Sequence, residues 1–293
     1  MVFRKSLILI TMAVVSCKIA AQSNLQNYTP SILFDKGDWE VKSFQNLYWQ
    51  SKIFDGIGTQ KVESPSGTQL WLTSINQFLY GINNQINVGI DVWGKHTAYE
   101  QTAFGTNTAI VGIGPKIKIA PFKNLKRLSI QSTFLFPLAN DLENREESGM
   151  GSPYFLHEDA SLWLTQFFYD KPLSEQFQLF FQQAFWYHFA RNSFRSGNYL
   201  KTQTSIFLNY FPNNRWTLYA MSEYFPTHYS YISESDQGAN AFDNFFIQSG
   251  IGLKYQLIFN KLELELLATD FWAGSNGQGA GQTVNLGLRW VKQ

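Results

Sequence analysis

The chain has 293 residues, long enough for one large domain or two small ones. Its formal charge is +1, from 23 basic and 22 acidic residues, and this balance excludes the large basic excess that nucleic-acid-binding proteins show. Aromatic residues make up 17% of the chain and charged residues only 15%. Such a mixture is unusual for a cytosolic enzyme and suits a protein with a surface that faces lipid.

The first 21 residues have the three parts of a secretory signal peptide. Arg4-Lys5 form the basic region, Leu7–Val15 the short apolar core, and Ala20-Ala21 the small residues of a cleavage site. We therefore expect cleavage after Ala21 and export from the cytoplasm. A second interpretation stays open, because the run VVSC that ends at Cys17 also resembles a lipoprotein signal in which this cysteine is acylated.

From Gly37 onward, apolar and polar residues alternate with a period of two, as in strands with one apolar face. The segment 81–95, GINNQINVGIDVWGK, shows the pattern, with Ile86, Val88, Ile90 and Val92 on one face and Asn87, Asp91 and Lys95 on the other. The predicted strands are about twelve and span 39–52, 69–81, 85–96, 107–120, 126–138, 155–169, 176–190, 199–211, 215–225, 243–257, 261–272 and 282–292. No run of about 18 uninterrupted apolar residues follows the signal, so we expect no transmembrane helix.

Short and long connections alternate between these predicted strands. Turns such as Pro212–Asn214 alternate with longer polar loops such as 139–154. This order is typical of an up-and-down barrel in an outer membrane, with turns in the periplasm and loops outside. We therefore predict an all-β fold, a single antiparallel transmembrane β-barrel over residues 37–293, preceded by a periplasmic segment over 22–36. The alternative is a secreted β-sandwich or an eight-stranded barrel with an apolar core, but sandwich strands are usually shorter.

Aromatic residues gather at the ends of the predicted strands, where a barrel would cross the membrane interface. At the periplasmic ends we expect an interface ring of Tyr80, Tyr210, Trp216, Tyr255 and Trp290, with Phe168 at the same level. In this barrel Ile86, Val88, Ile90 and Val92 would place their side chains in lipid. Asn87, Asp91 and Lys95 would point into the lumen.

With these features the chain resembles the Gram-negative outer-membrane β-barrel proteins, including porins and transporters. The closing strand QTVNLGLRWVKQ (282–293) is similar to their C-terminal assembly signal, with Gly287 three residues before Trp290, although it ends in Val-Lys-Gln instead of an aromatic residue. The stretch GIGPKIKIAPFKNLKRLSIQSTFLFPLAND (112–141) resembles outer-membrane proteins grouped with phenol-degradation pathways. The glutamine after the Ala-Ala cleavage site and the abundance of Asn, Phe and Tyr resemble Bacteroidetes proteins.

Charged residues at inward positions cluster near the periplasmic end of the predicted barrel. They are Lys116, Lys118 and Arg127 on neighbouring strands, and Glu40, Lys42, Lys254, Glu263, Glu265 and Arg289 on the strands that close the barrel. They could form a constriction that selects solutes by charge, with the first three attracting anions because no acidic residue lies beside them on their own two strands. They could equally form a lattice of ion pairs that closes a narrow barrel, since buried charges must be paired.

Two histidines are candidates for a metal or pH-sensing site. If strands 155–169 and 176–190 pair symmetrically about the turn near Pro172, His157 lies opposite His188, with Asp159 on the same face. Imidazole and carboxylate groups at that distance can bind a divalent metal or titrate near neutral pH. The plainer interpretation is two polar residues in a wet lumen, because no further ligand is evident.

We expect a channel or transporter for a small polar, anionic or amphipathic solute, its lumen lined by mixed charges. The aromatic residues that we expect to point inward are Trp93, Trp163, Phe180, Trp186 and Phe207. A non-conducting structural or partner-binding barrel is the alternative, and an outer-membrane hydrolase a lesser one, because His157, Asp159 and Ser161 alternate along one strand without the contacts of a triad. We expect no enzymatic activity, no cofactor and no nucleic acid. The expected partners are outer-membrane lipid, the barrel-assembly machinery and a small solute; the sequence does not give an oligomeric state.

Overall fold

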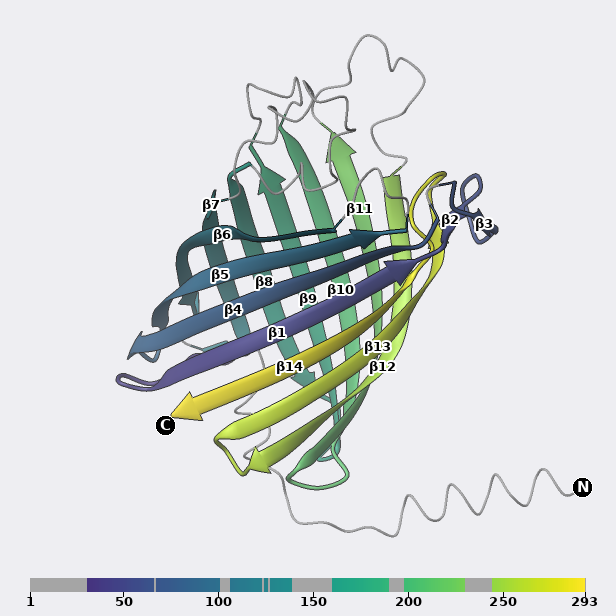
Figure 1. Cartoon of the computed structure of the whole chain (residues 1–293). Coiled ribbons are helices and arrows are strands. Elements are labelled where there is room, and N and C mark those ends of the chain that lie inside the picture. Colours follow the sequence, from purple (N-terminus) through teal and green to yellow (C-terminus); the bar gives the residue numbers. More distant parts are fainter. Residues whose placement is uncertain are drawn as a thin grey trace, which may run out of the picture.

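The computed structural model describes residues 31–65, 67–100, 106–122, 124–125, 127–138, 160–189, 198–229 and 244–292. Within them, twelve antiparallel strands form one closed barrel, in which each strand pairs with its neighbours along the chain and β14 pairs with β1 (Figure 1). These strands are β1 (Trp39–Gln50), β4 (Gln69–Asn83), β5 (Ile86–Tyr99), β6 (Thr106–Ile119), β7 (Leu128–Pro137), β8 (Leu162–Pro172), β9 (Phe177–His188), β10 (Tyr199–Tyr210), β11 (Trp216–Tyr229), β12 (Asn244–Ile258), β13 (Leu262–Gly274) and β14 (Gln282–Lys292). No helix in the described part of the chain is long and apolar enough to cross a membrane. The predicted fold class and strand number are confirmed.

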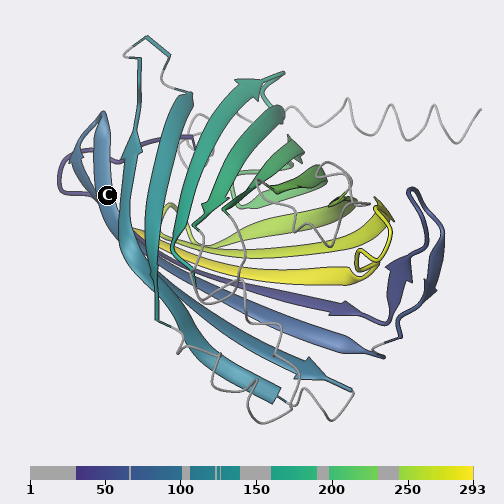
Figure 2. The same ribbon diagram turned by 90° about the horizontal axis from the view of Figure 1, so that it is seen from above.

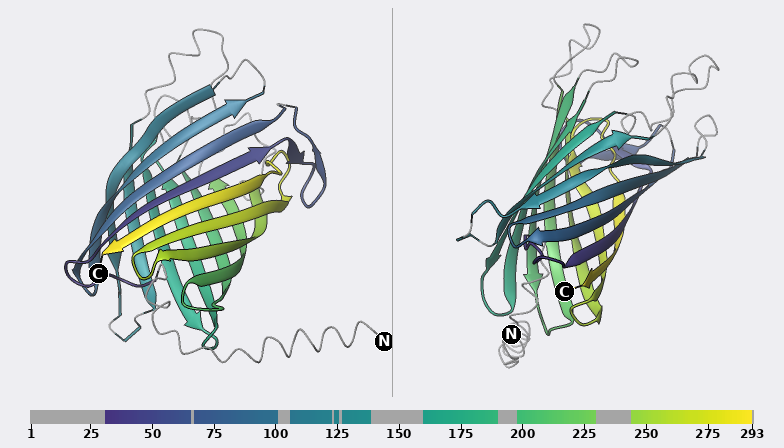
Figure 3. Two further views of the ribbon diagram at one scale, coloured as in Figure 1. Left: turned by 60° about the horizontal axis from the view of Figure 1, so that its bottom comes forward. Right: turned by 90° about the vertical axis from the view of Figure 1, so that its left-hand side faces the viewer.

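The barrel has two unlike ends. The five short connections, the start of β1 and the end of β14 lie at one end, which we call the turn end (Figures 1 and 3). The longer connections lie at the other, which we call the loop end. Figure 2 shows these strands from above, and we call the interior that the closed barrel encloses the lumen. Closing the ring pairs Trp39 with Lys292 and Trp49 with Gln282, so no strand edge stays open between β1 and β14.

The first long connection is more ordered than the sequence predicts. Instead of a plain loop over 53–68, it forms a hairpin of β2 (Lys52–Phe54) and β3 (Lys61–Glu63). Phe54 is fully buried against Phe271 and Ala280, and isolated bridges join the hairpin to Gly274 and Gly279. The prediction missed these strands because three-residue runs are too short to show a period of two.

The alternation of residues on β5 gives the orientation that the sequence predicts. Ile86, Val88 and Ile90 are exposed on the outside, at 36%, 39% and 41%, whereas Asn87 and Asp91 are completely buried on the inside. An apolar exterior around a polar interior is the arrangement of a barrel that faces lipid.

The alternation fails at one place on β6. There the register shifts between the pairs Trp93–Gly112 and Gly94–Ile110, so Val111 is an extra residue, a β-bulge. The bulge turns Val111 inward, where it is 3% exposed, and turns Ile110 outward. Strict alternation along β6 would place Val111 on the outer face with Ile113; the structure does not, because one inserted residue exchanges the two faces of the strand beyond it.

Aromatic side chains ring the outside of the turn end. Tyr80, Trp216 and Trp290 are exposed there; the Trp216 ring lies 4.5 Å from that of Tyr255, and Tyr210 stacks on Phe177 at 5.0 Å. Phe168 does not belong to this ring. It points into the lumen, at 5% exposed, and stacks on Phe180.

Candidate functional site: the lumen

The chain before β1 folds back into the turn end of the barrel. Phe34 is buried between Leu79 of β4 and Val291 of β14. The side-chain amide of Asn87 on β5 donates its N–H to the Phe34 carbonyl, and its oxygen accepts from the Phe34 N–H. Further on, the Ser31 hydroxyl donates to Asp170 of β8. Because β8 lies five strands from β1 around a ring of twelve, this segment, residues 31–38, crosses the mouth of the lumen.

A glycine allows this segment to lie close to the wall. The Gly37 N–H donates to the Gly81 carbonyl at 3.0 Å, and the Gly81 N–H donates to the Asp38 carbonyl at 2.9 Å. A Cβ atom at position 81 would lie 2.0 Å from the Asp35 carbonyl oxygen, so no larger residue fits there without moving the segment. The sequence predicts a periplasmic segment over 22–36, but no pattern in it indicates that this segment contacts the lumen.

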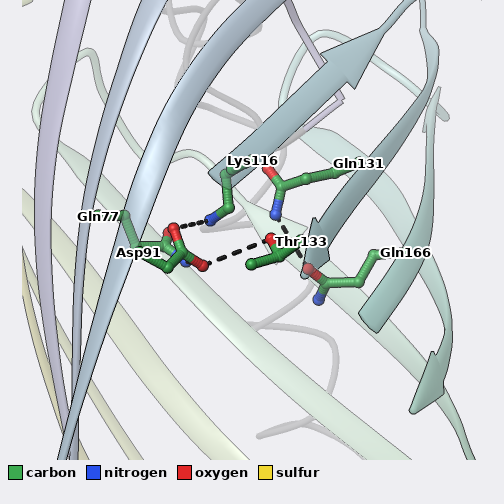
Figure 4. Close-up of polar contacts among 6 residues, drawn as sticks. All are labelled: Gln77, Asp91, Lys116, Gln131, Thr133 and Gln166. Atoms are coloured by element: carbon green, nitrogen blue, oxygen red, sulfur yellow. Dashed lines mark hydrogen bonds and ion pairs between the residues drawn. The ribbon is translucent and has the colours of Figure 1, made fainter. Parts of the chain in front are cut away.

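The three basic residues that were expected to attract anions do not stand alone. Lys116 Nζ forms an ion pair at 2.6 Å with Asp91, and both side chains are almost completely buried (Figure 4). Asp91 also accepts from Gln77 at 3.2 Å and Thr133 at 3.5 Å. The prediction considered only the two strands that carry the basic residues, whereas the register places Asp91 of the preceding strand, β5, diagonally opposite Lys116.

The other two basic residues have different surroundings. Lys118 is also buried, and its ammonium group donates to the Ile32 carbonyl at 2.6 Å, so the segment 31–38 covers it. Arg127 lies just before β7, and its carbonyl accepts from the Asp170 N–H at 3.1 Å. These contacts join β6, β7 and β8 to the segment at the turn end.

The remaining predicted charges lie together on the closing strands. Arg289 forms an ion pair with Glu40. Lys254 lies 3.4 Å from Glu265, which also accepts from the Tyr219 hydroxyl at 2.6 Å. Lys42 and Glu263 lie on the same wall, each paired in register with Arg289. Among the described residues neither of the two has an ion-pair partner within 4.0 Å.

A cavity of about 180 Å³ lies inside the lumen beside these charges. Its second wall is aromatic, because inward side chains on neighbouring strands stack in a row. Phe168 contacts Phe180, Phe180 contacts Phe207 at 5.3 Å, and Phe207 contacts Tyr219 at 6.0 Å. Tyr219 lies flat over Gly252, where a Cβ would come within 2.3 Å of the ring. The cavity therefore joins a wall of aromatic and uncharged polar side chains on β9–β11 to a charged wall on β12, β13 and β1.

Nearer the loop end, the lumen carries a polar network and then apolar packing. Glu223 accepts from Gln203, Ser205 and Gln248, and the chain of bonds continues through Thr269 to Thr283. Beyond it, aromatic rings in contact follow the inner wall; in order they are Trp93, Trp186, Phe225, Phe246, Phe271, Tyr48 and Trp71.

Two of these rings approach each other between strands that are not neighbours. Trp93 of β5 and Trp186 of β9 meet edge to face at 5.8 Å, and they pack on a cluster of Val111, Leu135 and Leu164. Trp93, Trp186, Phe180 and Phe207 were predicted to point inward, and they do. Trp163 was predicted wrongly. It is 51% exposed on the outside, where it donates to Ser132, because Leu162 and Leu164 take the inward positions.

The predicted pairing of histidines is not formed. The turn between β8 and β9 spans 173–176, so His188 lies opposite Leu162 and not opposite His157. His188 is buried near Trp93 and Leu135, whereas His157 and Asp159 lie outside the described residues. In the part of the chain that the structure describes, no three His, Cys, Asp or Glu residues are grouped so as to hold a metal.

Solved structures with a similar fold include an outer membrane channel and two autotransporter domains. An outer membrane channel from Pseudomonas putida F1 matches 90% of this chain and 98% of its own at 10% identity, with a TM-score of 0.65. The β domain of the Bordetella autotransporter BrkA matches 87% of this chain and 99% of its own at 9% identity, with a TM-score of 0.54. The translocator domain of the autotransporter NalP from Neisseria meningitidis matches 92% of this chain and 91% of its own at 8% identity, with a TM-score of 0.50. No protein-family model and no curated protein sequence matches the chain. The chain therefore has the β-barrel fold that these proteins share.

Proposed function

We propose that this protein is an outer-membrane channel through which a small amphipathic solute passes. Its apolar exterior, its interface aromatics and its closed barrel support insertion into a membrane with the turn end in the periplasm. The P. putida channel, which has the same fold, is consistent with this assignment. A protein in this location would contact outer-membrane lipid and would need the barrel-assembly machinery during biogenesis.

The observation that carries this proposal is the cavity of about 180 Å³ beside the aromatic row and the charged wall. A barrel that served only as a scaffold would gain stability from a lumen filled with well-packed side chains, since interiors normally leave few voids. Here the segment 31–38 fills the side of the mouth near β4–β8, and space remains on the side near β9–β13 and β1. The remaining space is therefore a candidate path for a solute.

The chemistry of the lumen favours an amphipathic solute over simple ions. Lys116 and Lys118 already bind Asp91 and the Ile32 carbonyl, and Lys254 lies 3.4 Å from Glu265. The attraction of an anionic group therefore falls to Lys42, which lines the cavity. Toward the loop end, Trp93 and Trp186 form an apolar narrowing, and apolar narrowings oppose hydrated ions by dewetting. A solute with an apolar part can replace lost water contacts with contacts to the aromatic rings.

The test is permeation through liposomes that contain the refolded mature protein. We expect them to swell in small amphipathic solutes faster than protein-free liposomes, and to show little current in a planar bilayer with potassium chloride. A correctly folded barrel that passes no solute of this class would refute the channel and support the alternative, a non-conducting structural or partner-binding barrel. Heat-dependent mobility on a gel verifies folding.

A further inference from the structure

The two walls of the lumen cavity differ in chemistry, and the difference points to a type of solute. Phe180, Phe207 and Phe211 present carbon surface from β9 and β10 and the turn that follows. Opposite them, β12, β13 and β1 present two lysines and two glutamates, Lys254, Glu263, Glu265 and Lys42. A molecule that fills this space meets aromatic rings on one side and charges of both signs on the other. Between the rings lie the uncharged polar side chains of Gln178, Gln182, Asn209 and Thr217.

Half of these charges neutralise each other within the wall. Lys254 lies 3.4 Å from Glu265, and its ammonium group also lies 5.7 Å from the centre of the Tyr219 ring. The Tyr219 hydroxyl completes the set by donating to Glu265 at 2.6 Å. The carboxylate of Glu265 therefore has two protein donors, and this pair does not need a solute to balance it.

Lys42 and Glu263 are different, because both line the cavity and neither reaches an opposite charge within 4.0 Å among the described residues. The Lys42 ammonium group lies 6.0 Å from the centre of the Phe44 ring, and it attracts Glu40 and Glu265 only from beyond ion-pair distance. Both residues pair in register with Arg289, so they lie at the same height, with one strand between them. Two strand spacings separate their backbones by about 10 Å, and both side chains lean into the same cavity.

We propose that this cavity binds a small zwitterion that carries an apolar group, with its carboxylate at Lys42, its ammonium group at Glu263 and its apolar part against Phe180 and Phe207. This inference rests on the proposed channel function and names its solute class. A solute with only one charge would neutralise one of the two side chains and leave the other unpaired in a partly buried site, which is unfavourable. A hydrophobic α-amino acid has the required chemistry.

The test compares four probes of related shape for binding to the refolded protein in detergent by calorimetry. Phenylalanine has both charges and a ring, 3-phenylpropanoate only the negative charge, 2-phenylethylammonium only the positive charge, and glycine no ring. We expect phenylalanine to bind about tenfold or more tightly than each of the others. The two singly charged probes lose a hydrogen bond to a charged group, which contributes roughly that much, and glycine loses the burial of the ring.

Two variants make the test specific. Lys42→Gln should reduce the preference for phenylalanine over 2-phenylethylammonium to near one, and Glu263→Gln should do the same for 3-phenylpropanoate. The matched controls are Lys52→Gln and Glu63→Gln, an exposed pair on the β2–β3 hairpin, which should change no preference. Equal binding of all four probes to the parent protein, or variants that lose all binding without a crossed change of preference, would overturn the inference.

Permeation separates this inference from the proposed function. Liposomes that swell in a neutral sugar while phenylalanine shows no preferential binding would support the channel and overturn the zwitterion site. Phenylalanine binding with the crossed preferences, but without passage of any solute, would support the site and overturn the channel. Absence of both would overturn both.

Discussion

Lys116 of β6 and Asp91 of β5 form an ion pair at 2.6 Å on the inner wall of the barrel, with side chains only 2% and 1% exposed. Their register partners are two glycines, Gly89 and Gly114, and a Cβ at either position would lie 2.0 Å or 1.7 Å from a backbone carbonyl oxygen of the next strand, that of Phe78 or Phe134. The lumen charges near the segment 31–38 are thus part of the barrel's construction, and those beside the cavity are the candidates for contact with solute.

The first prediction concerns the stability of this pair. Asp91→Asn should lower the free energy of unfolding by about 3–5 kcal/mol, because it leaves a buried ammonium group without its counter-charge. The double variant Asp91→Asn, Lys116→Met should recover much of the loss, since it buries no charge. Urea unfolding in detergent, followed by tryptophan fluorescence, measures both values.

The Lys52–Glu63 pair on the β2–β3 hairpin is the control for this prediction. Its side chains are 49% and 77% exposed, and exposed ion pairs contribute about 0–1 kcal/mol. Lys52→Met should therefore change the unfolding midpoint little. Similar losses for Asp91→Asn and Lys52→Met would show that the Lys116–Asp91 pair is not a structural element.

The second prediction concerns the narrowing near the loop end. Replacing Trp93 and Trp186 together by alanine should increase solute flux and allow measurable ion current, because it removes the two rings that meet at 5.8 Å. Trp163→Ala is the control, since this ring lies outside the barrel. If liposome swelling and bilayer current stay at the parent level in the double variant, the two rings do not limit passage.

The third prediction concerns the segment 31–38. Phe34→Asp should release it, because a carboxylate cannot be buried between Leu79 and Val291 without a partner. Lys118 would then lose its contact with the Ile32 carbonyl and face the lumen, so anions should pass more readily. Reversal potentials in a salt gradient measure this change.

Asp35→Asn is the matched control in the same segment, because Asp35 is exposed and should leave selectivity unchanged. Deleting residues 22–36 from the mature chain is a second way to expose Lys118 and should act in the same direction. A folded Phe34→Asp protein with the ion preference of the parent would contradict a covering role for the segment.

The fourth prediction concerns Gly252 and the Tyr219 ring. Gly252→Ala should push the ring away, because the new Cβ would lie 2.3 Å from it, and should thereby break the hydrogen bond to Glu265. We expect a loss of about 1–3 kcal/mol in unfolding free energy. In a Tyr219→Ala background the same change should cost clearly less, and a double-mutant cycle without coupling would disprove the contact.

The sequence determined the strands, their number and the two ends of the barrel. These features depend on local patterns, namely a period of two and turn residues such as Asn260, which adopts a positive φ of 61° between β12 and β13. The apolar face of β5 was assigned to the outside correctly for the same reason, because a strand with one polar and one apolar face has few ways to satisfy both.

Only the tertiary structure decided which residues meet. The partner of His188 depends on where the turn between β8 and β9 begins, and the direction of Val111 depends on one bulge. Trp163 was misplaced because apolar residues occupy both faces of β8, so alternation alone does not tell inside from outside. Lys118 reaches the Ile32 carbonyl only when the chain before β1 folds into the barrel. Trp93 reaches Trp186 only when the ring of strands closes. Contacts across a lumen depend on the size and stagger of the whole barrel, and no local pattern records these.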